Sequence, residues 1–277
     1  MITLNYLVRK KSNISTDDFN AYWLGEHALK SIEIAHKMGV GRYTKCQTMH
    51  QDPANIAIQG MYGTATDTYD FVDQMVIGNL DDYKSALADS DVNDMLKSLH
   101  DASAGYVDFS ASDYWLSAEL PQLFPRNAAH ILALPSNTFL KIIYVPRRLS
   151  HLSLQEAQLH WNTCHGGLAR QYAEFLIYEK YVQAHRMDSS LVWQHKNLLN
   201  AEFENIDSII GQAEAWLDRR ELVGLEGPEV DDMLRMLGVD IELFVDPSTS
   251  HIFGTKEHVI LSQRIINEPV PTLFTVD

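Results

Sequence analysis

The sequence is poor in cysteine, in basic residues and in long apolar runs. Two cysteines in 277 residues are too few for a disulfide framework, and they match no zinc motif, so we expect a reducing compartment. The 22 Lys and Arg against 37 Asp and Glu give a net charge of −15, which disfavours nucleic acid and anionic membranes as partners. No segment approaches the roughly 20 apolar residues of a membrane helix, and the N-terminus has the wrong order of charges for a secretory signal. We expect a soluble cytoplasmic protein.

Cofactor motifs are also missing. The sequence has no Gly-rich phosphate loop, no G-x-S-x-G element and no dinucleotide fingerprint. His160 and Cys164 stand four residues apart on a predicted helix, a workable ligand pair, but no third or fourth ligand is evident. We therefore expect neither a metal nor a cofactor. The composition that remains, 45% hydrophobic and 10% aromatic, is that of a globular protein.

One sequence element occurs twice. Trp23 and His27 in "YWLGEH" recur 138 positions later as Trp161 and His165 in "HWNTCH". The same offset aligns "LNYLVRKKSNIS" (4–15) with "IIYVPRRLSHLS" (142–153), "VNDMLKSL" (92–99) with "VDDMLRML" (230–237), and "YVDFSAS" (106–112) with "FVDPSTS" (244–250). Chance does not keep one offset over separate blocks, so we interpret the chain as a tandem duplication. We predict domains at 1–118 and 137–277, joined by a proline-containing linker at 119–136.

Each copy predicts the element order β-α-β-β-α-β. A first strand over 3–9 alternates apolar and polar residues, and Ser15 and Ser153 are placed as N-caps of helices over 16–38 and 154–177. The second strand carries Tyr43 or Tyr181, the third covers 69–77 or 211–218, and the second helix contains 92–99 or 230–237. The last strand is expected at 104–111 or 241–248. This order is the ferredoxin-like unit of α+β proteins, whose bare sheet face must be covered by another layer.

The paired motif resembles that of a known family. A strand with basic residues, then S-x-x-[DE]-x-F-x-x-[YH]-W-x-x-x-H, then a strand with Arg-Tyr or Lys-Tyr is similar to the EthD-domain family. "FNAYWLGEH" is the closer copy, since Ala157 replaces Phe19 in the second. The resemblance implies two ferredoxin-like βαββαβ units packed sheet to sheet as an intramolecular dimeric α/β-barrel. It also implies small-molecule chemistry, because relatives include cofactor-free dehydratases and decarboxylases, but a fold does not fix an activity.

Histidine is the first candidate for chemistry. Phe19, Trp23 and His27 stand at i, i+4 and i+8 and so share one helix face. We expect His27 to reach the barrel cavity and act as an acid or base, because imidazole titrates near neutrality. His165 is the second candidate. The alternative interpretation is that the tryptophans pack the core and the histidines are structural.

Tyrosine and arginine complete the candidate site. Tyr43 is the third catalytic candidate, and substrate-binding roles are predicted for six further residues, namely Tyr6, Trp23, Arg9, Tyr144, Trp161 and Tyr181. If the tyrosine rings face the barrel interior, they line a pocket for an aromatic substrate. An arginine at the cavity mouth would anchor a substrate oxygen; the alternative is a solvated edge charge that discourages strand pairing.

The preferred hypothesis is a cofactor-independent enzyme of the lyase type. It would act by dehydration, decarboxylation or isomerisation on a hydrophobic aromatic or polyketide-like small molecule. The alternatives are a non-catalytic barrel that binds a hydrophobic ligand, and an oxidoreductase or haem-binding barrel of the monooxygenase kind with His27 or His165 as the axial ligand. A monomer and a homodimer are both compatible with an internally closed barrel.

Overall fold

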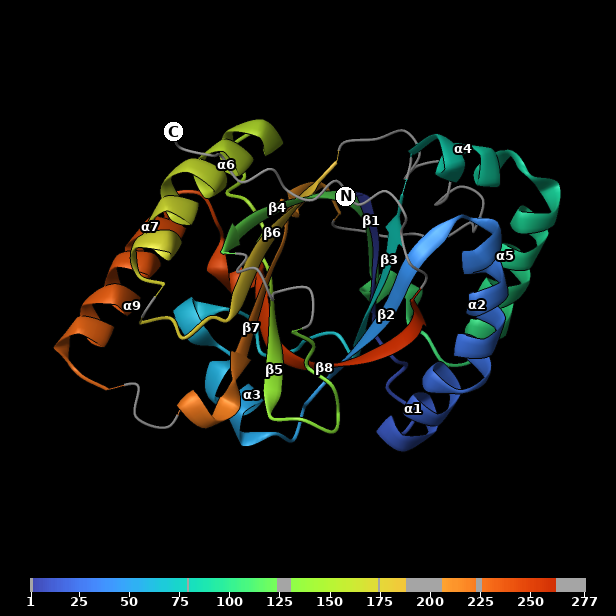
Figure 1. Cartoon of the computed structure of the whole chain (residues 1–277), viewed down its shortest axis with the longest axis horizontal. Helices are drawn as coiled ribbons and strands as arrows, with labels where there is room; N and C mark the ends of the chain where they lie inside the picture. Colours follow the sequence, from blue (N-terminus) through green and yellow to red (C-terminus); the bar gives the residue numbers. More distant parts are fainter. Residues whose placement is uncertain are drawn as a thin grey trace, which may run out of the picture.

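A single closed barrel of eight antiparallel strands forms the centre of the protein (Figure 1). The computed structural model describes residues 2–78, 80–123, 131–173, 175–187, 206–222 and 226–262. The strands are β1 (Ile2–Val8), β2 (Val40–Thr48), β3 (Phe71–Ile77), β4 (Asp113–Leu123), β5 (Phe139–Val145), β6 (Lys180–Arg186), β7 (Gly211–Asp218) and β8 (His251–Ser262). Around the barrel they follow the order β1-β3-β2-β8-β5-β7-β6-β4. The expectation of a mixed α+β barrel is confirmed.

Helices cover the barrel on two opposite sides (Figure 1). The larger helices of the first half are α1 (Thr16–Leu24), α2 (Glu26–Lys37), α4 (Leu80–Ala88) and α5 (Ser90–Ser103), and those of the second half are α6 (Leu154–His160), α7 (Gly166–Gln171) and α9 (Pro228–Ile241). The short helix α3 (Pro53–Ile58) packs near β8. Among the described residues, none of the helices has the length and apolar character that a bilayer span requires.

The two halves arrange their strands alike. Neighbouring strands run β4-β1-β3-β2 in the first half and β8-β5-β7-β6 in the second, which is the same order. The sequence led us to expect two sheets packed against each other around a barrel-like core. In the structure β2 pairs with β8 and β4 pairs with β6, so the two sheets join into one barrel by hydrogen bonds between their edges. Closure in this way leaves no open sheet edge.

The predicted last strands are wrong in position. Residues 104–111 come directly after α5, which ends at Ser103, and form a turn and a short 3-10 helix. Residues 241–248 begin with the last residue of α9 and lead into a similar 3-10 helix. The strands β4 and β8 start only at Asp113 and His251. The alternation in "YVDFSA" misled because Val107 and Val245 form only single bridges, with Lys10 and Arg148. The start of the predicted linker, 119–123, belongs to β4, and 124–130 lie outside the described residues.

The long first helix predicted in each half is interrupted. In the first half the break falls at Gly25, between α1 and α2. In the second half a π-helical segment, Trp161–His165, separates α6 from α7. Both predicted N-caps are confirmed: Ser15 Oγ accepts the Asp18 amide, and Ser153 forms a capping box with Glu156.

The barrel lumen is filled by side chains that connect the two halves. Gln74 on β3 donates to Glu214 on β7, four strands away, and accepts from Lys141 on β5. Lys141 Nζ also lies 2.8 Å from Glu214 and 3.8 Å from Glu257. These four side chains are at most 8% exposed. A buried charge is stable only when it is paired and hydrogen-bonded, so these contacts fix the closure of the barrel.

Removing the lumen cation tests this closure. Lys141→Met leaves Glu214 and Glu257 buried without their ammonium partner, and we expect the free energy of unfolding to fall by about 3–5 kcal/mol. Urea denaturation followed by circular dichroism measures the change. Lys84→Met, which removes one half of an exposed i,i+3 ion pair with Asp81, is the control and should leave the midpoint unchanged. Equal midpoints for the two variants would show that the lumen pair does not hold the barrel.

Candidate functional site

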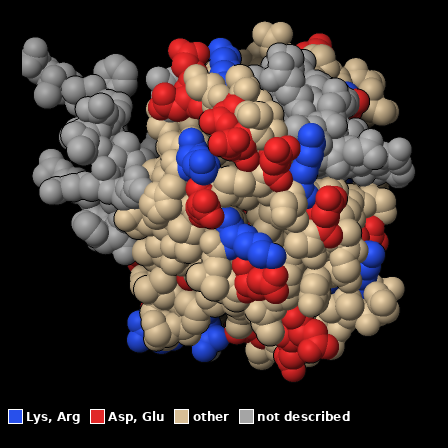
Figure 2. Space-filling view, turned by 90° about the vertical axis from the view of Figure 1, so that its right-hand side faces the viewer, with Lys and Arg blue, Asp and Glu red and all other residues tan. Residues whose placement is uncertain are grey.

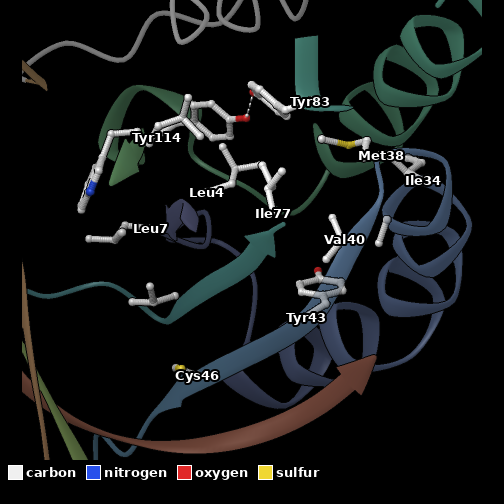
Figure 3. Packing of buried hydrophobic residues seen from close by; sticks show 14 of the residues in the cluster. Leu4, Leu7, Ile34, Met38, Val40, Tyr43, Cys46, Ile77, Tyr83 and Tyr114 are labelled. Carbon is white, nitrogen blue, oxygen red and sulfur yellow. Dashed lines mark hydrogen bonds between the residues drawn. The ribbon is translucent and has the colours of Figure 1, made fainter. Parts of the chain in front are cut away.

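The first half contains a cavity of about 90 Å³ between the outer face of the barrel and its helices, which we call cavity 1. Strands β1, β2, β3 and β4 form its floor, and α2 and α5 form its roof. Its lining residues are Leu4, Tyr6, His27, Ser31, Ile34, Met38, Tyr43, Asp73, Met75, Leu96, Leu99, His100, Ser103, Phe109 and Tyr114. Figure 3 shows part of this layer, including the Tyr114 and Tyr83 hydroxyls, which lie 3.1 Å apart. Most of the lining is apolar, so the few polar groups in it define how a ligand is oriented.

The sequence had suggested that the candidate residues face the barrel interior. In the structure they lie on its outer face instead. Strand side chains alternate between the two faces of a sheet. Tyr6 and Tyr43 line cavity 1 on the helix side. Figure 3 shows Tyr43 on this side, while Leu7 and Cys46 point the other way. The lumen is already occupied by Gln74 and its partners, and so the space for a ligand lies under the helices.

The Asp73 carboxylate on β3 is the centre of the polar contacts behind cavity 1. Its Oδ1 accepts Trp23 Nε1 at 2.9 Å, and its Oδ2 accepts the Tyr43 hydroxyl and Lys45 Nζ, both at 2.6 Å. Asp73 is 4% exposed and Lys45 is fully buried. The three donors compensate the buried charge and thereby tie α1 and β2 to β3.

His27 on α2 continues this network into the cavity. Lys45 Nζ lies 2.9 Å from its Nδ1, Ser31 Oγ lies 3.3 Å from the same nitrogen, and the ring stacks on Trp23 with a centroid distance of 3.6 Å. An ammonium can only donate, so Nδ1 accepts and the neutral imidazole carries its proton on Nε2. No described residue hydrogen-bonds to Nε2, and His27 lines the cavity. The Nε2–H group is therefore what His27 offers to a ligand.

The charges in this network are shifted by burial. Burial lowers the pKa of His27 well below its ordinary value, and the nearby Lys45 and Lys30 cations lower it further. Burial also lowers the pKa of Lys45 to about 8, although the Asp73 carboxylate acts in the opposite direction. Burial raises the pKa of Tyr43 well above its ordinary value, and Asp73 adds to the shift. At neutral pH the network thus holds a neutral imidazole, an ammonium and a neutral phenol.

His100 on α5 is a second imidazole in cavity 1. Its ring stacks on Phe109 with a centroid distance of 3.9 Å. Burial lowers its pKa below the ordinary value, against the opposing effect of Asp101. A neutral imidazole has one nitrogen with a free lone pair, so His100 can accept a proton inside the same cavity to which His27 presents an N–H group.

Sequence analysis missed Lys45, Asp73 and His100. Two of them left a signal: Lys45 is two residues from Tyr43 on a predicted strand, hence on the same face, and Asp73 interrupts the apolar strand "YDFVDQMVI". A charge inside a buried strand predicts a paired charge nearby. His100 follows an amphipathic helical block and has no comparable signal in the sequence.

The second half contains a corresponding cavity of about 60 Å³, which we call cavity 2. Three of the predicted residues, His165, Tyr144 and Tyr181, line it. The complete lining is Tyr62, Ile142, Tyr144, His165, Ala169, Leu176, Tyr178, Tyr181, Ala213, Ala215, Leu237, Ile241 and Ile252. The sequence-derived candidates are therefore divided between two separate cavities rather than gathered in one.

His165 has a different partner from His27. In the strand register Asp73 lies opposite Tyr6 and Lys45, and the position that lies opposite Tyr144 and Gln183 in the second half is Ala213. The second half therefore has neither the carboxylate nor the ammonium at these two positions. His165 Nδ1 lies instead 2.8 Å from Asp240 Oδ2.

Three other candidates lie outside both cavities. Arg9 pairs with Asp67 at 2.5 Å, and lies over the Tyr69 ring. Trp23 is fully buried behind cavity 1, where it supports His27 and Asp73. Trp161 is also buried and stacks on His185, with a centroid distance of 4.7 Å. None of these three side chains is among the described residues that line either cavity.

The cavities do not fit a metal or a haem. Within the described ranges no three His, Cys, Asp or Glu side chains gather as a metal site. Of the pair considered from sequence, His160 contacts Asp240 and Cys164 is exposed. His27 carries its proton on the nitrogen that would have to bind iron, and volumes of about 90 and 60 Å³ are too small for a porphyrin.

Comparison with known proteins gives one family match. Residues 11–110 match the model of the EthD domain. A proposed monooxygenase from Lactobacillus acidophilus NCFM is 10% identical, with a TM-score of 0.43 and 95% of each chain covered. A proposed monooxygenase from Fusobacterium nucleatum is 6% identical, with a TM-score of 0.48 and 93% of each chain covered. At these values the two structures support no conclusion about this chain, and no curated protein matches its sequence.

The family match coincides with the network around His27. Helices α1, α2 and α5 and strands β2 and β3 lie within residues 11–110, and these elements supply His27, Lys45, Asp73 and His100. The part of the chain that is similar to the EthD domain family, residues 11–110, is thus the part that carries this network.

Proposed function

We propose that the protein is a cofactor-independent enzyme that moves protons on a small hydrophobic molecule bound in cavity 1. The observation that carries the proposal is the contact between Lys45 Nζ and His27 Nδ1, at 2.9 Å. It makes His27 a hydrogen-bond donor toward the cavity. A neutral N–H group of this kind stabilises negative charge that develops on a substrate oxygen.

The proposed reaction is a dehydration. His100 takes a proton from a carbon of the substrate, the neighbouring C–O bond breaks, and His27 Nε2–H protonates the leaving oxygen. The Lys45 ammonium then supplies a proton to His27 Nδ1. The products are water, an unsaturated substrate, an imidazolium at His100, a His27 that now carries its proton on Nδ1, and a neutral amine at Lys45. Proton exchange with solvent restores all three side chains. Isomerisation and decarboxylation use the same two histidines without loss of water.

The apolar lining supports a hydrophobic substrate of limited size. A cavity of about 150 Å³ holds one benzene ring, and cavity 1 at about 90 Å³ is smaller. Met38 and Met75 in its lining are flexible side chains that can move aside for a ring. We propose a single-ring carbonyl or hydroxy compound rather than a large polyketide.

The proposed division of the chain follows from the same elements. The shared strand order, the 138-residue offset and the matching positions of α5 and α9 support a tandem duplication of a ferredoxin-like unit. On this proposal the first copy kept the EthD-type network and the second replaced it.

Replacing either histidine tests the proposed reaction. We expect His27→Gln and His100→Gln each to lower the turnover of a single-ring hydroxyketone by roughly 10²–10⁴-fold, the usual contribution of acid–base catalysis. The measurement is mass spectrometry of a hydroxyketone panel incubated with the full chain in deuterated water, scored for loss of water, loss of CO₂ and deuterium uptake.

The control for this assay is His151→Gln, an exposed histidine outside both cavities, which should retain full turnover. Full turnover in His27→Gln would contradict the proposal. Binding of the panel without any chemical change would favour the ligand-binding barrel, and gain of oxygen would favour the oxidoreductase.

The pH profile tests the role of Lys45. Its ammonium predominates below a pKa of about 8, so activity should decline as the pH rises through that value. His27 and His100 have lowered pKa values, so the acidic decline should lie below the ordinary histidine pKa of about 6.5. Lys45→Gln, the residue that stands at the corresponding position 183, should remove the alkaline decline and keep the acidic one. An unchanged alkaline limb in this variant would exclude Lys45 as the proton source.

A further inference from the structure

Cavity 2 contains a buried hydroxyl without a protein partner. Tyr144 on β5 is 8% exposed, and its hydroxyl makes no hydrogen bond to any described residue. The nearby Ser250 hydroxyl acts to lower the pKa of this phenol, but the two groups do not meet hydrogen-bond geometry; Ser250 Oγ donates to the Asp246 carbonyl at 2.8 Å and accepts the Arg147 amide at 2.9 Å. Burial raises the pKa of Tyr144, so the hydroxyl keeps its proton. A buried polar group of this kind is normally satisfied, which indicates a bound partner in the cavity.

The histidine in the same cavity is held in the opposite tautomer from His27. Its Nδ1 faces Asp240 Oδ2 at 2.8 Å, and a carboxylate accepts, so Nδ1 of His165 carries the proton. His160 Nε2 lies 2.9 Å from the other carboxylate oxygen and holds the carboxylate in place. Although burial alone would raise it, the pKa of Asp240 is lowered by these two hydrogen bonds, which favour the charged form. In neutral His165 the lone pair is therefore on Nε2, which has no partner among the described residues.

The remaining lining of cavity 2 is apolar apart from the phenols of Tyr62, Tyr178 and Tyr181. The Tyr181 hydroxyl accepts Gln183 Nε2 at 3.2 Å. No Lys, Arg, Asp or Glu is among the described residues that line this cavity. A charged ligand would have no counter-ion there, so the cavity favours a neutral one. The proposal rests on the two groups of opposite hydrogen-bond character described above, the buried Tyr144 hydroxyl as donor and His165 Nε2 as acceptor.

We propose that cavity 2 is a second ligand site, which binds the hydroxyl end of a small neutral alcohol or phenol. The ligand hydroxyl donates to His165 Nε2 and accepts from the Tyr144 hydroxyl. The site has the opposite polarity to cavity 1, where His27 donates. This binding does not depend on the reaction proposed for cavity 1.

Nitrogen NMR of the full chain with ¹⁵N-labelled histidine tests the site. The probe is phenol, titrated at about pH 8, above the ordinary pKa of histidine. The His165 signals, identified by their loss in His165→Gln, should show an unprotonated Nε2 without phenol and a shift of that nitrogen as phenol binds. Toluene, which has the ring but not the hydroxyl, should leave the nitrogen unshifted.

Two variants separate this site from cavity 1. Tyr144→Phe should weaken phenol binding at His165 roughly threefold to tenfold, as expected for one hydrogen bond. His27→Gln should leave the His165 response to phenol unchanged. This result would show that binding in cavity 2 does not depend on the reaction proposed for cavity 1. A His165 nitrogen that does not respond to phenol, or that carries a proton on Nε2 at this pH, would overturn the proposal, as would equal affinity in Tyr144→Phe.

Discussion

Burial of the Asp73 carboxylate is the constraint on which the first half of the protein depends. A charge that is 4% exposed must be compensated, and Trp23, Tyr43 and Lys45 supply the three donors. These donors come from α1 and β2, so the compensation fixes a helix and a neighbouring strand against β3. The same requirement places an ammonium against His27 and thereby decides which of its nitrogens carries the proton.

The two halves show how one framework supports opposite chemistry. In each half a histidine, His27 or His165, lines a cavity between the sheet and the helices. In each half a charged group contacts the Nδ1 atom of that histidine. That group is the Lys45 cation in the first half and the Asp240 anion in the second. At the 138-residue offset the first-half position that corresponds to Asp240 is Ala102, so the anionic partner belongs to the second half. The change of sign converts the cavity-facing nitrogen from a donor into an acceptor.

The cavities lie between the barrel and its helices, because the barrel interior is already filled by side chains. The lumen is occupied by Lys141, Glu214, Gln74 and their neighbours, which stabilise closure and leave their charges satisfied. On the outer face of the first-half helices, acidic and basic side chains are interspersed (Figure 2). A surface of this kind has no extended basic region on the face shown, which agrees with the excess of acidic residues in the composition.

The sequence by itself determined the local and repeated features. The 138-residue offset, the N-caps at Ser15 and Ser153 and the tyrosine-bearing strands follow from short-range patterns, because caps and strand alternation depend on neighbouring residues. The last strands were misplaced because the residues around Val107 and Val245 alternate as in a strand, although each valine forms only an isolated bridge.

Only the tertiary structure decided what the polar side chains do. Asp73, Lys45 and His27 lie far apart along the chain, and strand pairing together with helix packing brings them into contact. The cavities lie on the helix side of the sheet because side chains of both halves fill the lumen. The proton position on each histidine depends on a charge supplied by another element, and that is a property of the folded arrangement.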